Sequence, residues 1–540
     1  MAVGKEQTMN RTTGRPQPFG AAVEQDRINF SVQVPKGKSC ALLLYRKGKA
    51  QPAARYEMPE EDGVGEVRFL AVQGIDAEKY EYNFEINGKV TIDPYVREIT
   101  GKKAFGRERD LSAHEIRGKL VPTDYDWEDD KRLHLRWDEV VAYSLHVRGF
   151  TKHSSSKVRH KGTYLGVTEK LPYLKELGIN QIQCMPVYEF EDCKKGKINY
   201  WGYGPAYYFA PKEAYASGDS AVRELKDMVR SCHRQGIEVV LEMPFAEGVP
   251  VQTVLECLRF YMLEYHVDGF VVNPYTVPWE ILCADPFLKD VKLMRKDDAF
   301  QNVMRRFLKG DENMVNDVMW ALSHNSSSDG KCNYITAQTG FTLWDLVSYD
   351  SKHNEANGEN NTDGPDYNYS WNCGAEGPSR KRAVMALRKN QVMNAFFLLL
   401  TAQGTPCILA GDEFYNTQKG NNNVYCQDNE IGWVDWSRLK TDQILFEFVK
   451  ELIALRREHP CLHREEELKG LDRTACGVPD VSYHGESAWQ VKNEVSSRQL
   501  GVLYSGIGAG DRECFIAYNM HWIPHMFALP SPGKGRGWEL

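Results

Sequence analysis

The sequence predicts a mixed α/β fold: a (β/α)8 (TIM) barrel between an N-terminal β-sandwich and a C-terminal antiparallel β domain. Three observations predict it. Short alternating segments fill the first 130 residues, buried-strand runs then alternate with helical runs over residues 140–414, and short β segments return after a long amphipathic helix. Because 540 residues exceed what one hydrophobic core organises, we expect three domains: residues 1–130, 131–440 and 441–540.

The N-terminal segments have the apolar–polar alternation of half-buried strands, with Gly, Pro and Asp turns between them. They are residues 27–34, 41–45 and 80–86. This pattern predicts the β-sandwich. A charged stretch, residues 124–132, predicts a linker to the next domain.

The central region predicts the barrel strands in order. They are residues 141–147, 181–187, 238–243, 268–273, 291–294, 333–337 and 406–410. A helix that ends at residue 177 separates the first strand from the second. A sixth strand between residues 313 and 331 has no clear pattern. An amphipathic helix at residues 442–459 and a β segment at 513–518 follow the barrel. In such barrels the functional site lies at the carboxyl ends of the strands.

Composition excludes several classes of partner. The net charge of −7 gives no basic surface for nucleic acid or anionic membranes. No apolar run is long enough for a signal peptide or a membrane span, so we expect a cytoplasmic protein. The thirteen cysteines are scattered and include no Cys-x-x-Cys pair. We therefore expect reduced thiols, with no disulfide framework, metal site or cofactor.

Seven sequence blocks resemble, in order, the isoamylase and bacterial glycogen-debranching branch of the α-amylase family, glycoside hydrolase family 13. They are residues 143–151, 162–166, 199–203, 352–361, 370–377, 410–414 and 420–428. The resemblance implies a carbohydrate-binding-type N-terminal β-sandwich, a catalytic-type barrel and a C-terminal β-sandwich. It also implies a role in glycogen or starch metabolism, with branched α-glucan such as glycogen or maltodextrin, and active glycogen-metabolism enzymes, as partners.

The positions that carry catalysis in this family are substituted. Retaining glycoside hydrolysis needs a carboxylate nucleophile and a carboxylic acid about 5 Å apart. The family's nucleophile corresponds to Asn273 and its neighbouring arginine to Val271, while Lys296 stands at the place of the acid. Gln338 and Thr339 replace the family's histidine and third carboxylate. We therefore expect no catalysis at this site.

Binding residues can be proposed from chemistry alone. Aromatic rings could stack on glucose, although aromatic residues in a barrel also pack in the core. The candidates are Trp201, Tyr203, Tyr207 and Trp371, with Glu242 at the end of the third strand. The long loop at residues 353–377 is rich in Asn, Asp, Glu and Gly and is a further candidate.

Three functions are compatible with these observations. The first is a pseudoenzyme that binds branched α-glucan. The second is an active α-1,6-glucosidase that uses displaced carboxylates, for which the candidates are Glu242, Glu247, Asp297 and Asp298. The third is a protein-interaction barrel without sugar binding, which would have its mouth filled by side chains.

Overall fold

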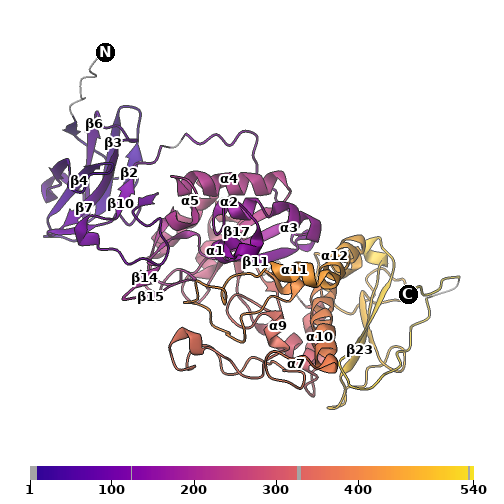
Figure 1. The fold of residues 1–540 in the computed structure, drawn as a ribbon. Coiled ribbons are helices and arrows are strands. Elements are labelled where there is room, and N and C mark those ends of the chain that lie inside the picture. Colours follow the sequence, from indigo (N-terminus) through magenta and orange to yellow (C-terminus); the bar gives the residue numbers. More distant parts are fainter. Residues whose placement is uncertain (1–8, 123, 325–329, 533–534) are drawn as a thin grey trace.

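The computed structural model describes residues 9–122, 124–324, 330–532 and 535–540. Antiparallel sheets lie at the N-terminal end, a unit of parallel strands and helices lies in the centre, and a small antiparallel sheet lies at the C-terminal end (Figure 1). This arrangement confirms the predicted mixed α/β fold class.

Two N-terminal sheets share one apolar core. The first has the order β1 (Asn10–Thr12), β6 (Val67–Gln73), β3 (Arg27–Gln33), β2 (Gly20–Val23). The second has the order β5 (Ala54–Glu57), β4 (Cys40–Arg46), β7 (Tyr80–Ile86), β10 (Arg117–Lys119), β9 (Ile99–Thr100), with β8 (Lys89–Thr91) beside β7. Phe30 and Leu70 from the first sheet pack with Leu42 and Phe84 from the second. The alternation in the sequence therefore predicts which faces meet.

Seven parallel strands form the central sheet within the described residues. Their order is β19 (Lys292–Arg295), β18 (Gly269–Val272), β17 (Glu238–Met243), β12 (Gln181–Cys184), β11 (Ala142–Leu145), β21 (Thr405–Leu409), β20 (Cys332–Asn333). The two ends of this row approach each other, since the Arg295 N–H donates to the Gly330 carbonyl at 2.8 Å. The sheet is thus a nearly closed barrel.

The described part of the segment searched for a sixth strand contains helix α8 (Val315–Ser323) and no strand. Residues 325–329 of that segment lie outside the described residues. Since β19 contacts the residue just before the strand pair β20–β21, the barrel nearly closes with seven strands.

Helices surround the barrel and lead from it to the C-terminal sheet. They are α1 (Val147–Lys152), α2 (Tyr164–Thr168), α3 (Leu171–Leu177), α4 (Ala221–Arg234), α5 (Val251–Tyr265), α6 (Trp279–Ala284), α7 (Ala299–Lys309), α9 (Leu343–Leu346), α10 (Arg382–Thr401), α11 (Ser437–Thr441) and α12 (Gln443–Glu458). Outside the barrel wall lie two antiparallel pairs, β13 (Tyr188–Phe190) with β16 (Ala206–Pro211) and β14 (Cys193–Lys194) with β15 (Lys197–Ile198).

The C-terminal sheet has the order β22 (Val481–His484), β23 (Gln499–Tyr504), β24 (Cys514–Asn519). Helices α10 and α12 lie between it and the barrel (Figure 1). Tyr518 of β24 contacts Thr401 of α10, with their hydroxyl oxygens 2.6 Å apart. The predicted domain limit at residue 130 falls between β10 and β11, and the one at residue 440 falls inside α11. Both limits stay predictions.

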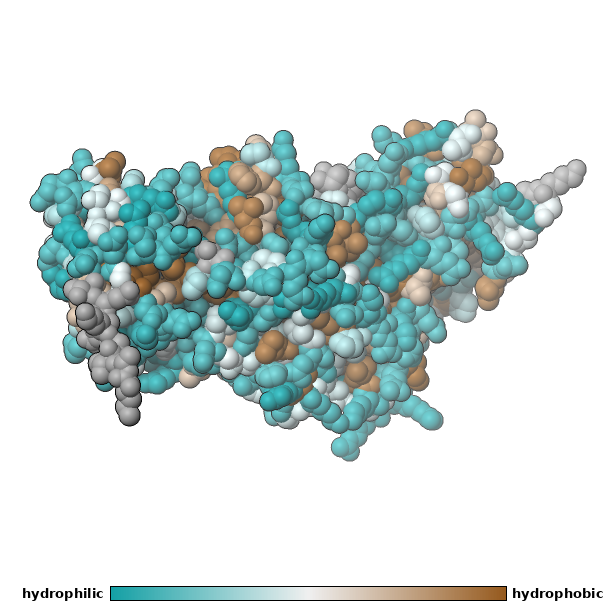
Figure 2. Space-filling model, turned by 90° about the horizontal axis from the view of Figure 1, so that it is seen from above, coloured by the Kyte–Doolittle hydropathy of each residue, from teal (hydrophilic) through white to brown (hydrophobic). Residues whose placement is uncertain are grey.

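On the face seen in Figure 2 the surface is mainly hydrophilic, and its apolar residues form small separate patches. Among the described helices, none has the length and apolarity that crossing a membrane requires.

Candidate functional site

A cavity of about 830 Å³ opens at the carboxyl ends of β17, β18 and β19. Parallel barrel strands bring their carboxyl ends to one rim, where this fold places its functional residues. Eight residues singled out from the sequence line it: Tyr203, Glu242, Glu247, Val271, Asn273, Lys296, Asp297 and Asp298. The structure therefore gathers most of the predicted site into one place.

Glu242 lies at the centre of a three-residue contact. Its Oε1 accepts hydrogen bonds from Lys296 Nζ at 2.7 Å and from Tyr203 Oη at 2.6 Å, and Nζ lies 3.2 Å from Tyr203 Oη. Burial alone would lower the pKa of Lys296, but the negative charge of Glu242 outweighs it, so this pKa is raised above its ordinary value. Lys296 is thus a fixed cation at neutral pH and a poor proton donor.

Asn273 is engaged by the turn that follows β18. Its side-chain Oδ1 accepts a hydrogen bond from the Tyr275 N–H at 3.0 Å, and its carbonyl accepts one from the Thr276 N–H at 3.1 Å. This is the local capping for which asparagine is well suited. Val271 packs in the barrel interior with Val240, Met294 and other apolar side chains, so no cation stands beside Asn273 from that position.

The acidic residues beside Glu242 also have partners. Asp297 accepts a hydrogen bond from Lys331 Nζ at 2.8 Å, and Asp298 accepts one from Tyr334 Oη at 2.6 Å. Burial would raise the pKa of Asp297, but the Lys331 ammonium and nearby donors outweigh it and lower this pKa. Glu247 is exposed at the rim.

Gln338 and Thr339 do not line this cavity. Gln338 Nε2 donates to the Ser144 carbonyl at 3.4 Å, and Thr339 is exposed after β20. Val271, Asn273 and Lys296 therefore share one cavity, whereas Gln338 and Thr339, which follow β20, lie apart from it.

The aromatic candidates separate into two groups. Tyr203 lines the cavity, and the buried Trp201 lies behind it with ring centroids 5.6 Å apart. Tyr207 packs in a small core beside the N-terminal sheets, and Trp371 packs against the barrel core. Tyr275, which sequence reasoning missed, lines the cavity and is 94% exposed. Its position directly after a barrel strand was the available signal, but exposure cannot be seen in the sequence.

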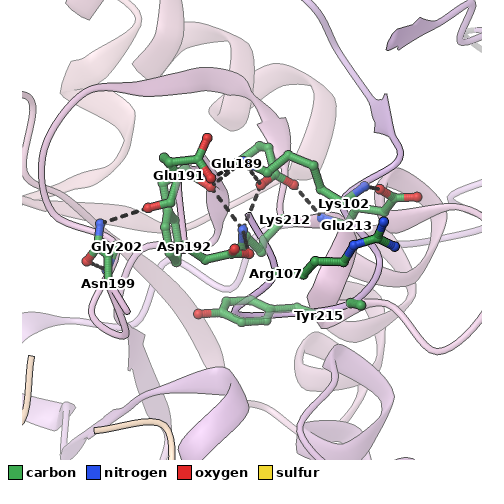
Figure 3. Close-up of polar contacts among 12 residues, drawn as sticks. Lys102, Arg107, Glu189, Glu191, Asp192, Asn199, Gly202, Lys212, Glu213 and Tyr215 are labelled. Atoms are coloured by element: carbon green, nitrogen blue, oxygen red, sulfur yellow. Dashed lines mark hydrogen bonds and ion pairs between the residues drawn. The ribbon is translucent and has the colours of Figure 1, made fainter. Parts of the chain in front are cut away.

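A buried charge cluster fixes the hairpin that carries Tyr203. Lys212 Nζ, at the end of β16, donates to Glu189 Oε1 at 2.7 Å, Asp192 Oδ2 at 2.6 Å and the Phe190 carbonyl at 3.0 Å. Figure 3 shows the ammonium between the two carboxylates and, further along the loop, Asn199 beside Gly202. Because the protein's own ammonium neutralises these oxygens, this cluster needs no bound cation.

The loop at residues 353–377 is held by amide pairs with the block at residues 420–428. Asn354 Nδ2 donates to Asn422 Oδ1 at 2.9 Å, and the Asn422 N–H donates to Asn354 Oδ1 at 2.9 Å. Asn421 Nδ2 likewise donates to Asn357 Oδ1 at 2.9 Å. These blocks thus have a structural role, since buried amides must be paired.

The comparisons with known proteins agree with this architecture. Residues 145–246 match the family "Alpha amylase, catalytic domain". The chain is 30% identical to isoamylase 1, chloroplastic, of Arabidopsis thaliana, over 97% of this chain and 84% of that protein. It is also 30% identical to the glycogen debranching enzyme of Erwinia tasmaniensis, over 84% of this chain and 85% of that protein. The pullulanase from Bacillus acidopullulyticus has a similar fold, with a TM-score of 0.72 at 21% identity over 95% of this chain and 70% of that one. A pullulanase mutant from Paenibacillus barengoltzii, complexed with maltotetraose, also has a similar fold. Its TM-score is 0.71 at 19% sequence identity, over 94% of this chain and 89% of that one.

The nearly closed parallel barrel with a cavity at its carboxyl strand ends defines an α-amylase-type protein. Within that class, the chain belongs to the isoamylase and glycogen-debranching family, as the sequence blocks indicate. The alignment with the Arabidopsis protein spans 670 positions, although this chain has 540 residues, so at least 130 aligned positions have no counterpart here. This chain is therefore shorter than that relative within the aligned region.

Proposed function

We propose that this protein is a debranching-enzyme-like pseudoenzyme of α-glucan metabolism, which binds branched α-glucan in the cytoplasm without hydrolysing it. The observation that carries the proposal is the contact of Lys296, Glu242 and Tyr203 in the barrel-mouth cavity. A cation fixed to a carboxylate stands where hydrolysis would need a free acid.

Chemistry supports the absence of hydrolysis. A retaining glycosidase forms a covalent intermediate on a carboxylate, and Asn273 offers a neutral amide already bonded to the Tyr275 N–H. Enzymes lower barriers by roughly 8–23 kcal/mol, and the loss of both nucleophile and acid removes the groups that supply most of this reduction.

The open cavity supports binding. About 830 Å³ is within the usual range for ligand sites. Tyr203 and Tyr275 offer ring faces to sugars, and the charged side chains offer hydrogen bonds to hydroxyl groups. An open mouth disfavours the interaction barrel with a filled mouth.

The ring of Tyr275 provides the test of binding. Tyr275→Ala is expected to weaken the affinity for branched maltodextrin roughly 3- to 10-fold, because a stacking ring contributes about 1 kcal/mol. Tyr367→Ala is the matched control, since Tyr367 is 64% exposed and does not line the cavity. Equal affinities for the two variants would place the ligand elsewhere.

The active alternative draws on the acids that line the cavity. Of these, Glu242, Asp297 and Asp298 each bind a lysine or tyrosine, which disfavours the role of a free nucleophile or acid. The triple variant Asn273→Asp, Lys296→Glu, Thr339→Asp tests docking. New reducing ends would mean that glucan still reaches the ancestral position. A partnership with active glycogen-metabolism enzymes is part of the proposal, and co-purification with such an enzyme tests it.

A further inference from the structure

Three metal-ligating side chains converge where α12 meets the C-terminal sheet, and a fourth residue, Cys461, lies beside them. His459 follows the last residue of α12, Cys461 lies in the 3-10 turn Pro460–Leu462, and Asp511 and Cys514 lie just before and at the start of β24. The ligand atoms of His459, Asp511 and Cys514 lie within 4.8 Å of one another. This cluster is far along the chain from every residue of the barrel-mouth cavity.

Cys461 lies beside this group of three. Its thiol neighbours both the Cys514 thiol and the Asp511 carboxylate, and its N–H donates to Asp511 Oδ2 at 3.2 Å. Cys461 is buried, with 1% of its surface exposed. His459, Asp511 and Cys514 line a cavity of about 830 Å³, which gives an ion a path to the site.

We propose that His459, Cys461, Asp511 and Cys514 bind one divalent transition-metal ion of the zinc class. Thiolate, imidazole and carboxylate are the ligands that zinc takes in tetrahedral sites. With metal–ligand bonds of about 2.0–2.3 Å, neighbouring ligands of a tetrahedron lie about 3.3–3.8 Å apart. His459 Nδ1 and Asp511 Oδ1 share a hydrogen bond at 3.2 Å, just below this range, and the ion would take the place of the shared proton.

The ion would join the end of α12 to β24 and so attach the C-terminal sheet to the helices that cover the barrel. In the proposed site Cys461 supplies the fourth ligand, so that protein would fill all four positions, as in structural rather than catalytic zinc sites. Sequence spacing could not reveal the site, because the cysteines are 53 positions apart and only the fold brings them together.

Cobalt substitution tests the site on the full-length, reduced protein after removal of metals with a chelator. One equivalent of Co²⁺ is expected to give a thiolate-to-cobalt charge-transfer absorption that Zn²⁺ abolishes. Cys514→Ser and, separately, His459→Gln are expected to weaken Co²⁺ binding by about 100-fold or more, since each removes one of four ligands. Cys476→Ser is the control, because Cys476 is exposed and outside the cluster.

Far-UV circular dichroism establishes that each variant is folded before its affinity is compared. Absence of the charge-transfer band in the wild-type protein would overturn the proposal, and so would an unchanged band in Cys514→Ser. A Cys461–Cys514 disulfide in the isolated protein, with no cobalt band after reduction, would assign the two cysteines to redox chemistry instead and equally overturn it.

Discussion

Lys296 is the residue on which the proposed absence of hydrolysis depends most. It keeps Glu242 paired at the barrel mouth, where the carboxylate is 10% exposed and the lysine 40% exposed. Because the pKa of Lys296 is raised, the stability that its ion pair contributes is fully present below the pKa of lysine in the unfolded chain. It is lost only when the pH rises through the pKa in the folded protein. The ion pair therefore persists throughout the neutral range.

Lys296→Met is expected to lower the free energy of unfolding by about 1–2 kcal/mol, because it leaves Glu242 partly buried without its cation. The value is below that of a fully buried pair since solvent reaches the lysine. Urea denaturation measures the change. Lys492→Met is the control: its pair with Glu486 is exposed on both sides and is expected to contribute little to stability. Equal losses in both variants would refute a special role for Lys296.

Asp412 gives a prediction about pH. This fully buried carboxyl accepts a hydrogen bond from the Leu343 N–H at 2.9 Å, and burial raises its pKa to about 8. Because the folded pKa exceeds the unfolded value of about 3.9, the folded state holds the proton more tightly. The contribution of Asp412 to stability therefore falls as the pH rises from about 4 to about 8.

Asp412→Asn removes this titration and keeps an amide oxygen to accept the Leu343 N–H. Relative to wild type, the variant is expected to gain stability steadily between pH 5 and pH 8, as measured by urea denaturation at several pH values. Parallel curves for the two proteins would contradict the raised pKa.

Residue identities predicted much of the site. The substitutions at Asn273 and Lys296 could be recognised because flanking motifs fix their alignment, and both side chains line one cavity. The sequence could not show that Lys296 meets Glu242, since the partners come from different strands. Trp371 and Tyr207 illustrate the converse, because aromatic residues suit a core as well as a sugar site.

At the scale of elements, the hairpin of β13 and β16 positions Tyr203 through the Lys212 cluster. Lys212→Met is expected to cost about 3–5 kcal/mol, because Asp192 would remain buried without a cation and Glu189 would keep only the more distant Lys102 Nζ at 3.7 Å. Lys197→Met, on the same hairpin, changes a lysine that is 79% exposed and is expected to have little effect. Urea midpoints that coincide for the two variants would show that the cluster does not stabilise the hairpin.

Strands flanked on both sides were predicted best. Residues 238–243 coincide with β17, which pairs with β12 and β18 and is buried throughout. β20 is shorter than the predicted residues 333–337, because it pairs with β21 alone at the gap of the barrel. The sequence between residues 313 and 331 shows no clear strand pattern. In the structure, the described residues of that segment include helix α8 and no strand.

At the scale of the whole molecule, the chain keeps the family's architecture, and we propose that its barrel mouth has lost the family's catalytic chemistry. Retained blocks such as residues 353–377 and 420–428 bind each other through buried amides, so they can persist without catalysis. The cavity is open where the sequence resemblance places the catalytic pair, at Asn273 and Lys296. Binding without hydrolysis is the function that fits both facts.

Isothermal calorimetry of the purified protein with branched maltodextrin tests this claim most directly, because binding and hydrolysis differ in the time course of heat. We predict discrete injection heats that saturate, with the baseline restored after each injection and no new reducing ends. Sustained heat flow after each injection, accompanied by reducing ends, would contradict it and direct attention to Glu242, Glu247, Asp297 and Asp298 as working acids.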